Sequence, residues 1–390
     1  MDYLFDTGRF PSVLIPFVSL SYPVTRPSVT DSFHDATYYE IGYRDACVVV
    51  SLMVCMAVLR DVVRLTVLEP FAKWKLTRDW RARLERKTAG AAAANGNGHT
   101  NGHTNGAANG NGHTNGAANG KANGKANGKA HAVVEENGHV LEKAVDRPQE
   151  TSAEARIRRS VLRFAEQGWQ AIYYTAQWSL GLYIYLNIPT DLWGGYPHIP
   201  LAGPIKFYYL VQIAFYLHAV LVLNAEARRK DHWQMFTHHV ITIALIVASY
   251  SYNATRVGCM FLVLMDWCDI FLPLAKMLRY MSYQVSCDAM FVFWVVSWFA
   301  TRHVLFIKVL YDACVQPSEK GVLGWYPERG AYMSNPAYPI FLGLLFMLQI
   351  LQVIWGYMIC VVVIRVVKGQ PADDVRSDDE GDDEDVKKDR

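Results

Sequence analysis

Cysteine is scarce in this chain of 390 residues, and so is net charge. Only seven cysteines are present, and most of them fall inside apolar segments, so no disulfide framework is expected. The formal net charge is +2, so bulk charge says little about partners, although the distribution of charge along the chain is informative. Residues 1–40 lack a basic start followed by an apolar core, and no cleavable signal peptide is therefore expected.

Long apolar segments are abundant instead. Hydrophobic residues make up 52% of the chain, and the only polar side chains in residues 340–364 are Gln349 and Gln352. At about 1.5 Å per residue, a helix of that length crosses a bilayer. The sequence predicts an all-α integral membrane protein with about seven spans, with six and eight as the alternatives. The predicted spans are residues 42–60, 166–186, 204–224, 233–252, 257–275, 288–312 and 337–364.

A long polar segment separates the first two spans and carries the repeat NGHTNGAANG. A mixture of Asn, Gly and Ala cannot bury a core, so we expect a disordered tether rather than a metal-binding tract. The basic stretches 71–87 and 156–163 flank this segment, and short basic segments mark the cytosolic side of a membrane. Seven spans then place the N-terminus in the lumen and the C-terminus in the cytosol.

The C-terminal tail ends with Lys387 and Lys388 at the fourth and third positions from its end. This spacing is similar to the dilysine retrieval signal of endoplasmic-reticulum membrane proteins, so that membrane is the predicted location. The predicted organisation has five parts: a lumenal N-terminus (1–41), a first transmembrane helix (42–69), a cytosolic basic flank and linker (70–155), a six-helix domain (156–367) and an acidic cytosolic tail (368–390).

Ionisable side chains recur at one depth of the predicted fourth and fifth spans. The turn near residues 251–256 allows only an antiparallel helical hairpin, in which facing positions sum to about 507. His238 then lies opposite Asp269, and His239 and Asp266 lie at the same depth. Each ionisable group in a bilayer costs on the order of 2 to 3 kcal/mol, so four at one level indicate a shared polar cavity rather than isolated structural hydrogen bonds.

A histidine beside a carboxylate is an oriented base, because the carboxylate fixes the tautomer and stabilises the imidazolium. His238 and His239 are about 100° apart on a helix, so one should face the cavity and the other its wall. Membrane di-iron enzymes need about eight histidines in several clusters, and the spans supply too few, so no metal site is expected.

Two further features could serve substrate binding or have structural explanations. Arg302 in the sixth span either pairs with Asp266 or Asp269, or receives an anionic group of a substrate. Lys276 belongs to a basic rim at the cytosolic mouth that would suit a phosphorylated cofactor, although topology already explains basic residues there. Trp298 is of a kind that more often packs or faces lipid than contacts a ligand.

Residues 230–280, KDHWQMFTHHVITIALIVASYSYNATRVGCMFLVLMDWCDIFLPLAKMLRY, resemble the Lag motif of ceramide synthases in the TLC-domain family, and in detail the fungal branch. The resemblance extends over roughly 160–365, and the sixth span adds Thr301 and Arg302. It implies that six of the spans form a helical barrel around an acyl tunnel. The homeobox-like segment of many animal members is absent, so no nucleic-acid partner is expected.

The resemblance implies transfer of a long or very-long acyl group from acyl-CoA, a co-substrate, to a sphingoid base such as dihydrosphingosine or phytosphingosine. The resemblance implies no bound cofactor. It is compatible with a small single-pass regulatory subunit and with dimerisation. A histidine either deprotonates the sphingoid ammonium or first forms an acyl-imidazole, and we favour the second route. The alternatives are an acyltransferase on another lipid amine or alcohol, or a non-catalytic lipid sensor. The implied catalytic residues are His238, His239, Asp266 and Asp269, and the candidate substrate-binding residues are Arg302, Arg256, Lys276, Trp298 and Tyr250.

Overall fold

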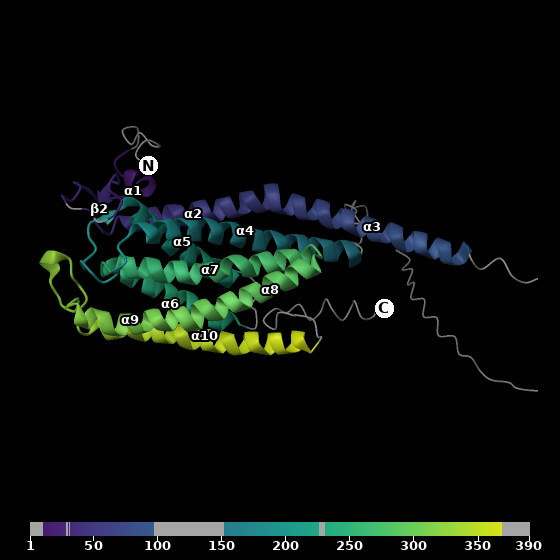
Figure 1. Cartoon of the computed structure of the whole chain (residues 1–390). Coiled ribbons are helices and arrows are strands. Elements are labelled where there is room, and N and C mark those ends of the chain that lie inside the picture. The colour runs from purple at the N-terminus through teal and green to yellow at the C-terminus, as the bar shows by residue number, and fades with distance from the viewer. Residues whose placement is uncertain (1–10, 29, 31, 97–151, 226–230, 369–390) are drawn as a thin grey trace, which may run out of the picture. The chain divides into compact units, whose positions relative to one another are not determined.

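A computed structural model of the chain describes residues 11–28, 30, 32–96, 152–225 and 231–368 (Figure 1). The predicted linker and the acidic tail lie almost entirely outside these residues, so their structure stays a prediction. The chain divides into two compact units, Met1–Leu76 with Ile157–Arg390, and Thr77–Arg156. The first unit contains every residue that the sequence predicts to be functional.

Seven long helical segments dominate the described residues and lie at the seven predicted spans. Two of them contain a π-helical stretch, η2 in the first and η3 in the sixth. In chain order the segments are α2 (Asp45–Val63) continuing through η2 (Arg64–Leu68) into α3 (Glu69–Gly96); α4 (Ser152–Asn187); α5 (Gly203–Ala225); α6 (His232–Ser251); α7 (Thr255–Tyr280); α8 (Gln284–Phe299) continuing through η3 (Ala300–Leu305) into α9 (Phe306–Glu319); and α10 (Ala337–Val367).

Five of these segments are long and apolar enough to cross a membrane, which confirms the predicted all-α membrane fold. They are Asp45–Gly90, Gly203–Ala225, Thr255–Tyr280, Gln284–Glu319 and Ala337–Val367. α4 and α6 are more polar, because α4 begins with a run of charged residues and α6 carries three histidines and a glutamine near its start. That these two helices also span the membrane stays a prediction.

Six of the segments follow one another around a ring. Stacking of Tyr173 on Phe215, with 3.6 Å between ring centroids, joins α4 to α5. α5 packs on α6, α6 on α10, α10 on α9 and α9 on α7. Trp178 and Trp267, 4.8 Å apart, bring α7 back to α4. α7 also packs on α6 and contacts α5 and α10 through Asp266 and Met265, and α2 lies outside these six segments against α5. The barrel around an acyl tunnel stays a prediction.

The turn between α6 and α7 forms the predicted hairpin. α6 ends at Ser251 and α7 begins at Thr255. Asn253 adopts the left-handed backbone conformation, φ 59°, which asparagine tolerates better than most residues because its short polar side chain bonds locally. The buried Asn253 side chain donates a hydrogen bond to the Gly330 carbonyl, 2.7 Å away, which ties the hairpin to the loop before α10.

The N-terminal segment is joined to the ring by a small antiparallel sheet. β1 (Pro23–Val24) pairs with β2 (Tyr38–Tyr39), and β2 pairs with β3 (Leu201–Ala202), which directly precedes α5. A short helix, α1 (Ile15–Val18), lies before the first strand. The segment that the sequence predicts only as a lumenal N-terminus is therefore folded and paired with the strand before α5.

A buried ion pair lies beneath this sheet. Lys206 is fully buried, and its Nζ lies 2.7 Å from Oδ1 of Asp45. The same amine donates to the carbonyls of Ser21, 2.9 Å away, and Glu40, 2.6 Å away. Tyr250 of α6 donates to the other Asp45 oxygen at 2.8 Å. α2, α5 and α6 are thus linked through the carboxylate of Asp45, whose charge Lys206 balances. These contacts are hereafter called the Asp45–Lys206 network.

Candidate functional site

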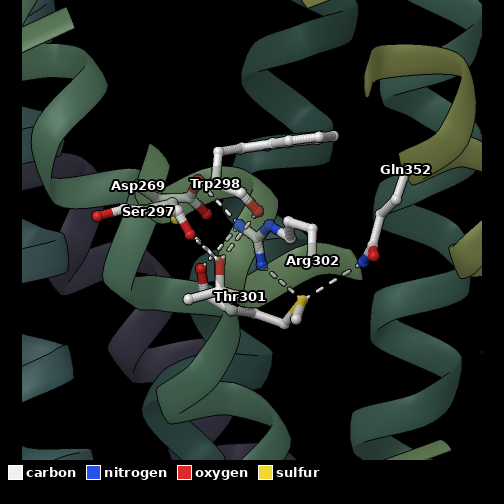
Figure 2. A network of polar contacts seen from close by, with 8 residues as sticks. Asp269, Ser297, Trp298, Thr301, Arg302 and Gln352 are labelled. Carbon is white, nitrogen blue, oxygen red and sulfur yellow. Dashed lines mark hydrogen bonds and ion pairs between the residues drawn. The ribbon is translucent and has the colours of Figure 1, made fainter. Parts of the chain in front are cut away.

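Arg302 connects η3 to α7 through the carboxylate of Asp269 (Figure 2). Its Nη2 donates to Asp269 Oδ1 at 3.2 Å and to the Met265 carbonyl at 2.8 Å. Nη1 contacts the Met265 sulfur, which also receives Gln352 Nε2 from α10 at 3.5 Å. In Figure 2 Arg302 accordingly lies between Asp269 and Gln352. Of the two readings that the sequence left open, the structure shows the pairing with an aspartate.

The π-helical stretch helps to place Arg302. A π-turn adds a residue to the helix and rotates the side chains that follow, and such turns occur often at functional sites. Within η3, Thr301 donates to the Ser297 carbonyl at 2.9 Å and lies 3.0 Å from the Cys268 sulfur on α7. Thr301 and Arg302 are both buried, so this stretch is anchored on α7 by adjacent polar side chains.

Asp266 has a different environment from Asp269, although both lie on α7. Its side chain is fully buried, and Oδ2 accepts a hydrogen bond from Nε2 of Gln212 on α5 at 2.6 Å. The other oxygen, Oδ1, is buried without a hydrogen-bond partner among the described residues. Asp266 therefore has a neutral partner, whereas Asp269 has a cationic one.

His238 and His239 face different neighbours, as their spacing on the helix predicts. Their ring centroids are 5.5 Å apart. His238 lies 5.2 Å from the Trp355 ring of α10, and His239 lies 5.8 Å from the Tyr216 ring of α5. Each Nδ1 is buried without a hydrogen-bond partner in the described part of the chain.

The expected hydrogen bond between a histidine and an aspartate is not formed among the described residues. Asp269 pairs instead with Arg302 of η3, and Asp266 bonds to Gln212 of α5 through one of its two oxygens. The arithmetic of the hairpin estimates depth along the helices, but it does not include the competing donors on α5 and η3. In this structure, therefore, no hydrogen bond to an aspartate fixes the tautomer or the orientation of either histidine.

Several buried polar atoms on α6 and on two helices that pack against it have no hydrogen-bond partner among the described residues. They are His238 Nδ1, His239 Nδ1, Thr242 Oγ1, Asp266 Oδ1, Gln352 Oε1 and Trp355 Nε1. They come from α6, α7 and α10, three members of the ring. Buried polar groups are normally hydrogen-bonded, because an unpaired one costs about 1 to 3 kcal/mol. Such a group of donors and acceptors is suited to binding a polar part of a ligand.

Two of the remaining candidate residues are Trp298 and Lys276. Trp298 is buried with its ring 5.2 Å from His303. Lys276 is half-buried on α7, about two turns beyond Asp269.

Arg256 and Tyr250 lie toward the opposite end of the hairpin. Arg256 donates to the Gly194 carbonyl at 3.0 Å, about 15 Å along α7 from Asp266, and Tyr250 belongs to the Asp45–Lys206 network. The structure does not bring these two residues to the histidines, because the rise of α6 and α7 places them about 15 Å away along the helices.

A cavity of about 670 Å³ lies near that opposite end, lined by parts of α4, α7, η3, α9 and the loop at 190–193. None of the predicted site residues lines it. At its rim Lys320 forms an ion pair with Asp191. The hydrogen bond from Lys320 holds the pKa of the Asp191 carboxyl below its usual value. This cavity is separate from the polar site around the histidines.

Sequence reasoning missed Gln212, together with Tyr173 of α4, which donates to Gln212 Oε1 at 3.3 Å. A signal was present, because Gln212 interrupts the apolar run LVQIAF of the third predicted span. A polar group inside a bilayer needs a partner, and this holds for a glutamine there as it does for the histidines. Trp355 offered no such signal, since tryptophan is common in membrane helices.

A family model and several known proteins match this chain over the helical domain. The family model TRAM_LAG1_CLN8, described as the TLC domain, matches residues 163–361. Sphingosine N-acyltransferase lag1 of Schizosaccharomyces pombe is 42% identical over 241 residues, covering 59% of this chain and 61% of that protein. Ceramide Synthase FUM18 of Gibberella moniliformis is 37% identical over 258 residues, covering 58% and 60%. Ceramide synthase 4 of Homo sapiens is 33% identical over 241 residues, covering 60% and 56%.

The chain thus spans about three fifths of the length of the curated relatives that it matches. The family match includes all nine candidate site residues and all six segments of the ring except the start of α4 and the end of α10. It covers more than half of the chain, and the chain therefore belongs to the TLC-domain family.

Proposed function

We propose that the protein is a ceramide synthase, which transfers a long or very-long acyl group from acyl-CoA to the amine of a sphingoid base. The observation that carries the proposal is the group of unpaired buried polar atoms around His238 and His239. It occurs in a TLC domain whose relatives are named sphingosine N-acyltransferase and ceramide synthase. A structural core would leave few such groups unpaired, whereas an acyl-transfer site needs them.

The histidines are suited to nucleophilic catalysis. In the route that we favour, an imidazole nitrogen attacks the thioester carbon, the carbon–sulfur bond breaks, and coenzyme A leaves as its thiolate. The sphingoid ammonium gives one proton to the other histidine, and the freed amine attacks the acyl-imidazole. The bond from the acyl carbon to the imidazole nitrogen then breaks, the released imidazole takes the second proton from the nitrogen, and the amide forms. In direct attack, a histidine would only remove the proton from the ammonium. Both histidines have a free Nδ1 among the described residues, so neither is tied to one tautomer.

The two aspartates are suited to different tasks. The guanidinium of Arg302 compensates Asp269, and the pair braces η3 against α7. No ion pair compensates Asp266 among the described residues, where its bonded partner is the neutral Gln212. A cation bound beside a buried carboxyl group stabilises its charged form, and the acyl acceptor arrives as an ammonium. We assign reception of that ammonium to Asp266 and a bracing role to Asp269.

We also propose a route by which acyl-CoA reaches the histidines. Acyl-CoA would approach from the cytosol, with its nucleotide near Lys276 and its acyl chain in a tunnel inside the ring. The endoplasmic-reticulum membrane, the lumenal N-terminus and the cytosolic C-terminus remain predictions from the sequence. The regulatory subunit, dimerisation and the expectation of no bound metal or cofactor remain predictions as well.

The decisive experiment supplies purified protein in lipid nanodiscs with acyl-CoA and dihydrosphingosine and determines the product by mass. Dihydroceramide formation supports the proposal. Transfer only to another lipid amine or alcohol would replace the acceptor, and binding without turnover would indicate a lipid sensor. Intact mass after incubation with acyl-CoA alone distinguishes the two routes. The covalent route predicts an acyl adduct that disappears in His238→Ala or His239→Ala, and the absence of any adduct under trapping conditions favours direct attack.

A further inference from the structure

A chain of buried polar groups runs from α4 through α5 to α7. The Tyr173 hydroxyl donates to Oε1 of Gln212 at 3.3 Å, and Gln212 Nε2 donates to Oδ2 of Asp266 at 2.6 Å. Nε2 also lies 3.4 Å from the Tyr208 hydroxyl. A carboxylate oxygen only accepts, so the amide must present its N–H to Asp266 and its carbonyl to the tyrosine. The chemistry of the two ends thus determines the orientation of the amide.

Gln212 orients Asp266 without neutralising it. Both side chains are fully buried, so bulk water does not replace this hydrogen bond. The amide engages Oδ2, while Oδ1 stays unpaired among the described residues. Arg302 gives Asp269 a positive charge instead. Of the two aspartates, Asp266 therefore combines a defined orientation with an oxygen that no hydrogen bond or ion pair occupies among the described residues.

We propose that Gln212 is a positioning residue that holds Asp266 with one oxygen available for the ammonium of the acyl acceptor. Tyr173 strengthens this hold, because a hydrogen bond to an amide carbonyl polarises the amide and makes its N–H a better donor. The inference rests on the proposed function and deepens it. It makes a long-chain cationic amine, rather than an alcohol, the acceptor for which the site is built.

The test compares two glutamine substitutions in the full-length protein. Gln212→Leu removes the donor to Asp266. Gln177→Leu is the matched control, because Gln177 is a buried glutamine of α4 that donates to the Tyr208 carbonyl at 3.3 Å and does not contact Asp266. KM is measured separately for dihydrosphingosine and for acyl-CoA. Folding is checked by size-exclusion profile and thermal unfolding.

A positioning role predicts a split between the two substrates. In Gln212→Leu, KM for dihydrosphingosine should rise about 10-fold or more, the effect of a hydrogen bond to a charged group, while KM for acyl-CoA changes less than about twofold. In Gln177→Leu both values should stay within about twofold of the wild type. Equal changes for the two substrates, or equal effects of the two variants, would show a merely structural role and overturn the inference.

Tyr173→Phe provides a second test that leaves the contact between Gln212 and Asp266 in place. It deletes one hydroxyl and should raise KM for dihydrosphingosine about threefold, again without changing KM for acyl-CoA. If Gln212→Leu does not fold, this variant decides: a raised KM for the base alone supports the inference, and an unchanged one overturns it.

The outcome also separates this inference from the proposed function. If the wild-type protein forms no dihydroceramide, the proposed function fails before any variant is compared. If the wild type forms it and Gln212→Leu behaves like Gln177→Leu, only the positioning role fails.

Discussion

Two buried carboxylates, Asp45 and Asp266, lie in networks of opposite character. Asp45 is compensated by the ammonium of Lys206 at 2.7 Å, and its second oxygen accepts hydrogen bonds from Tyr250 and from the backbone of Gly42. Asp266 has a neutral glutamine on one oxygen and no partner on the other among the described residues. A compensated pair serves to join helices, whereas an uncompensated group keeps its capacity for a ligand.

The two networks also differ in their relation to the family match. Asp45 lies before residues 163–361, and Lys206 and Tyr250 lie within them. The Asp45–Lys206 network therefore attaches a segment outside the TLC domain to two helices of its ring. Asp266 and its partner Gln212 both lie inside the match, on α7 and α5. We therefore expect substitutions in the Asp45–Lys206 network to alter stability, and substitutions of Asp266 or Gln212 to alter catalysis.

The largest expected effect is on stability. Lys206→Met leaves the Asp45 carboxylate buried without a counter-ion, which typically costs about 3 to 5 kcal/mol. We expect a marked fall in the unfolding temperature of the purified protein, measured at one detergent and lipid composition. The double variant Asp45→Asn with Lys206→Met should recover part of the loss, because no buried charge then remains. An unfolding temperature equal to that of the wild type in Lys206→Met would remove the distinction between the networks.

The next largest effect is on catalysis. Asp266→Asn keeps the shape of the side chain but removes the negative charge that would receive the ammonium. We expect kcat/KM for the sphingoid base to fall about 100- to 1,000-fold while the unfolding temperature stays within about 2 °C of the wild type. The measurement pairs the activity assay with thermal unfolding. Activity near the wild-type level would contradict the role assigned to Asp266.

A smaller effect is expected at Arg302. Lysine retains the charge, but it cannot present the planar fork that meets the Met265 carbonyl and Asp269 together. Arg302→Lys should lower kcat about 10-fold by loosening η3 against α7. Steady-state kinetics with both substrates measures the change. A variant indistinguishable from the wild type would show that the bracing contact does not contribute to turnover.

The smallest effect is expected at the exposed ion pair of Asp191 and Lys320. Lys320 lowers the pKa of Asp191, so this carboxylate stabilises the fold above its usual pKa and loses the contribution as pH falls through the lowered value. Both side chains are substantially exposed, so the gain is below about 1 kcal/mol. Asp191→Asn should be slightly less stable than the wild type at pH 7, and the difference should shrink as the pH falls below the usual pKa of an aspartate, as thermal unfolding over a pH series would show. A difference that does not shrink as the pH falls would show that the ion pair is not its cause.

Much of the fold was predictable, because the signals for it are local. An apolar run specifies a membrane helix by its length, and the short turn at Asn253 specifies an antiparallel hairpin. The ordered N-terminal segment was not predictable. Its sheet joins residues 23 and 202, and its ion pair joins residues 45 and 206, so no local pattern reports either contact.

The sequence by itself determined which helices carry the ionisable groups and how far along each helix they lie, since helical rise converts residue number into position. Only the tertiary structure decided the partners. Asp266 bonds to Gln212, 54 residues away, and Asp269 pairs with Arg302, 33 residues away. Such choices depend on how each helix is rotated about its axis, and packing against several neighbours sets that rotation. The same rotation leaves His238 and His239 free of both aspartates, with their Nδ1 atoms available for chemistry.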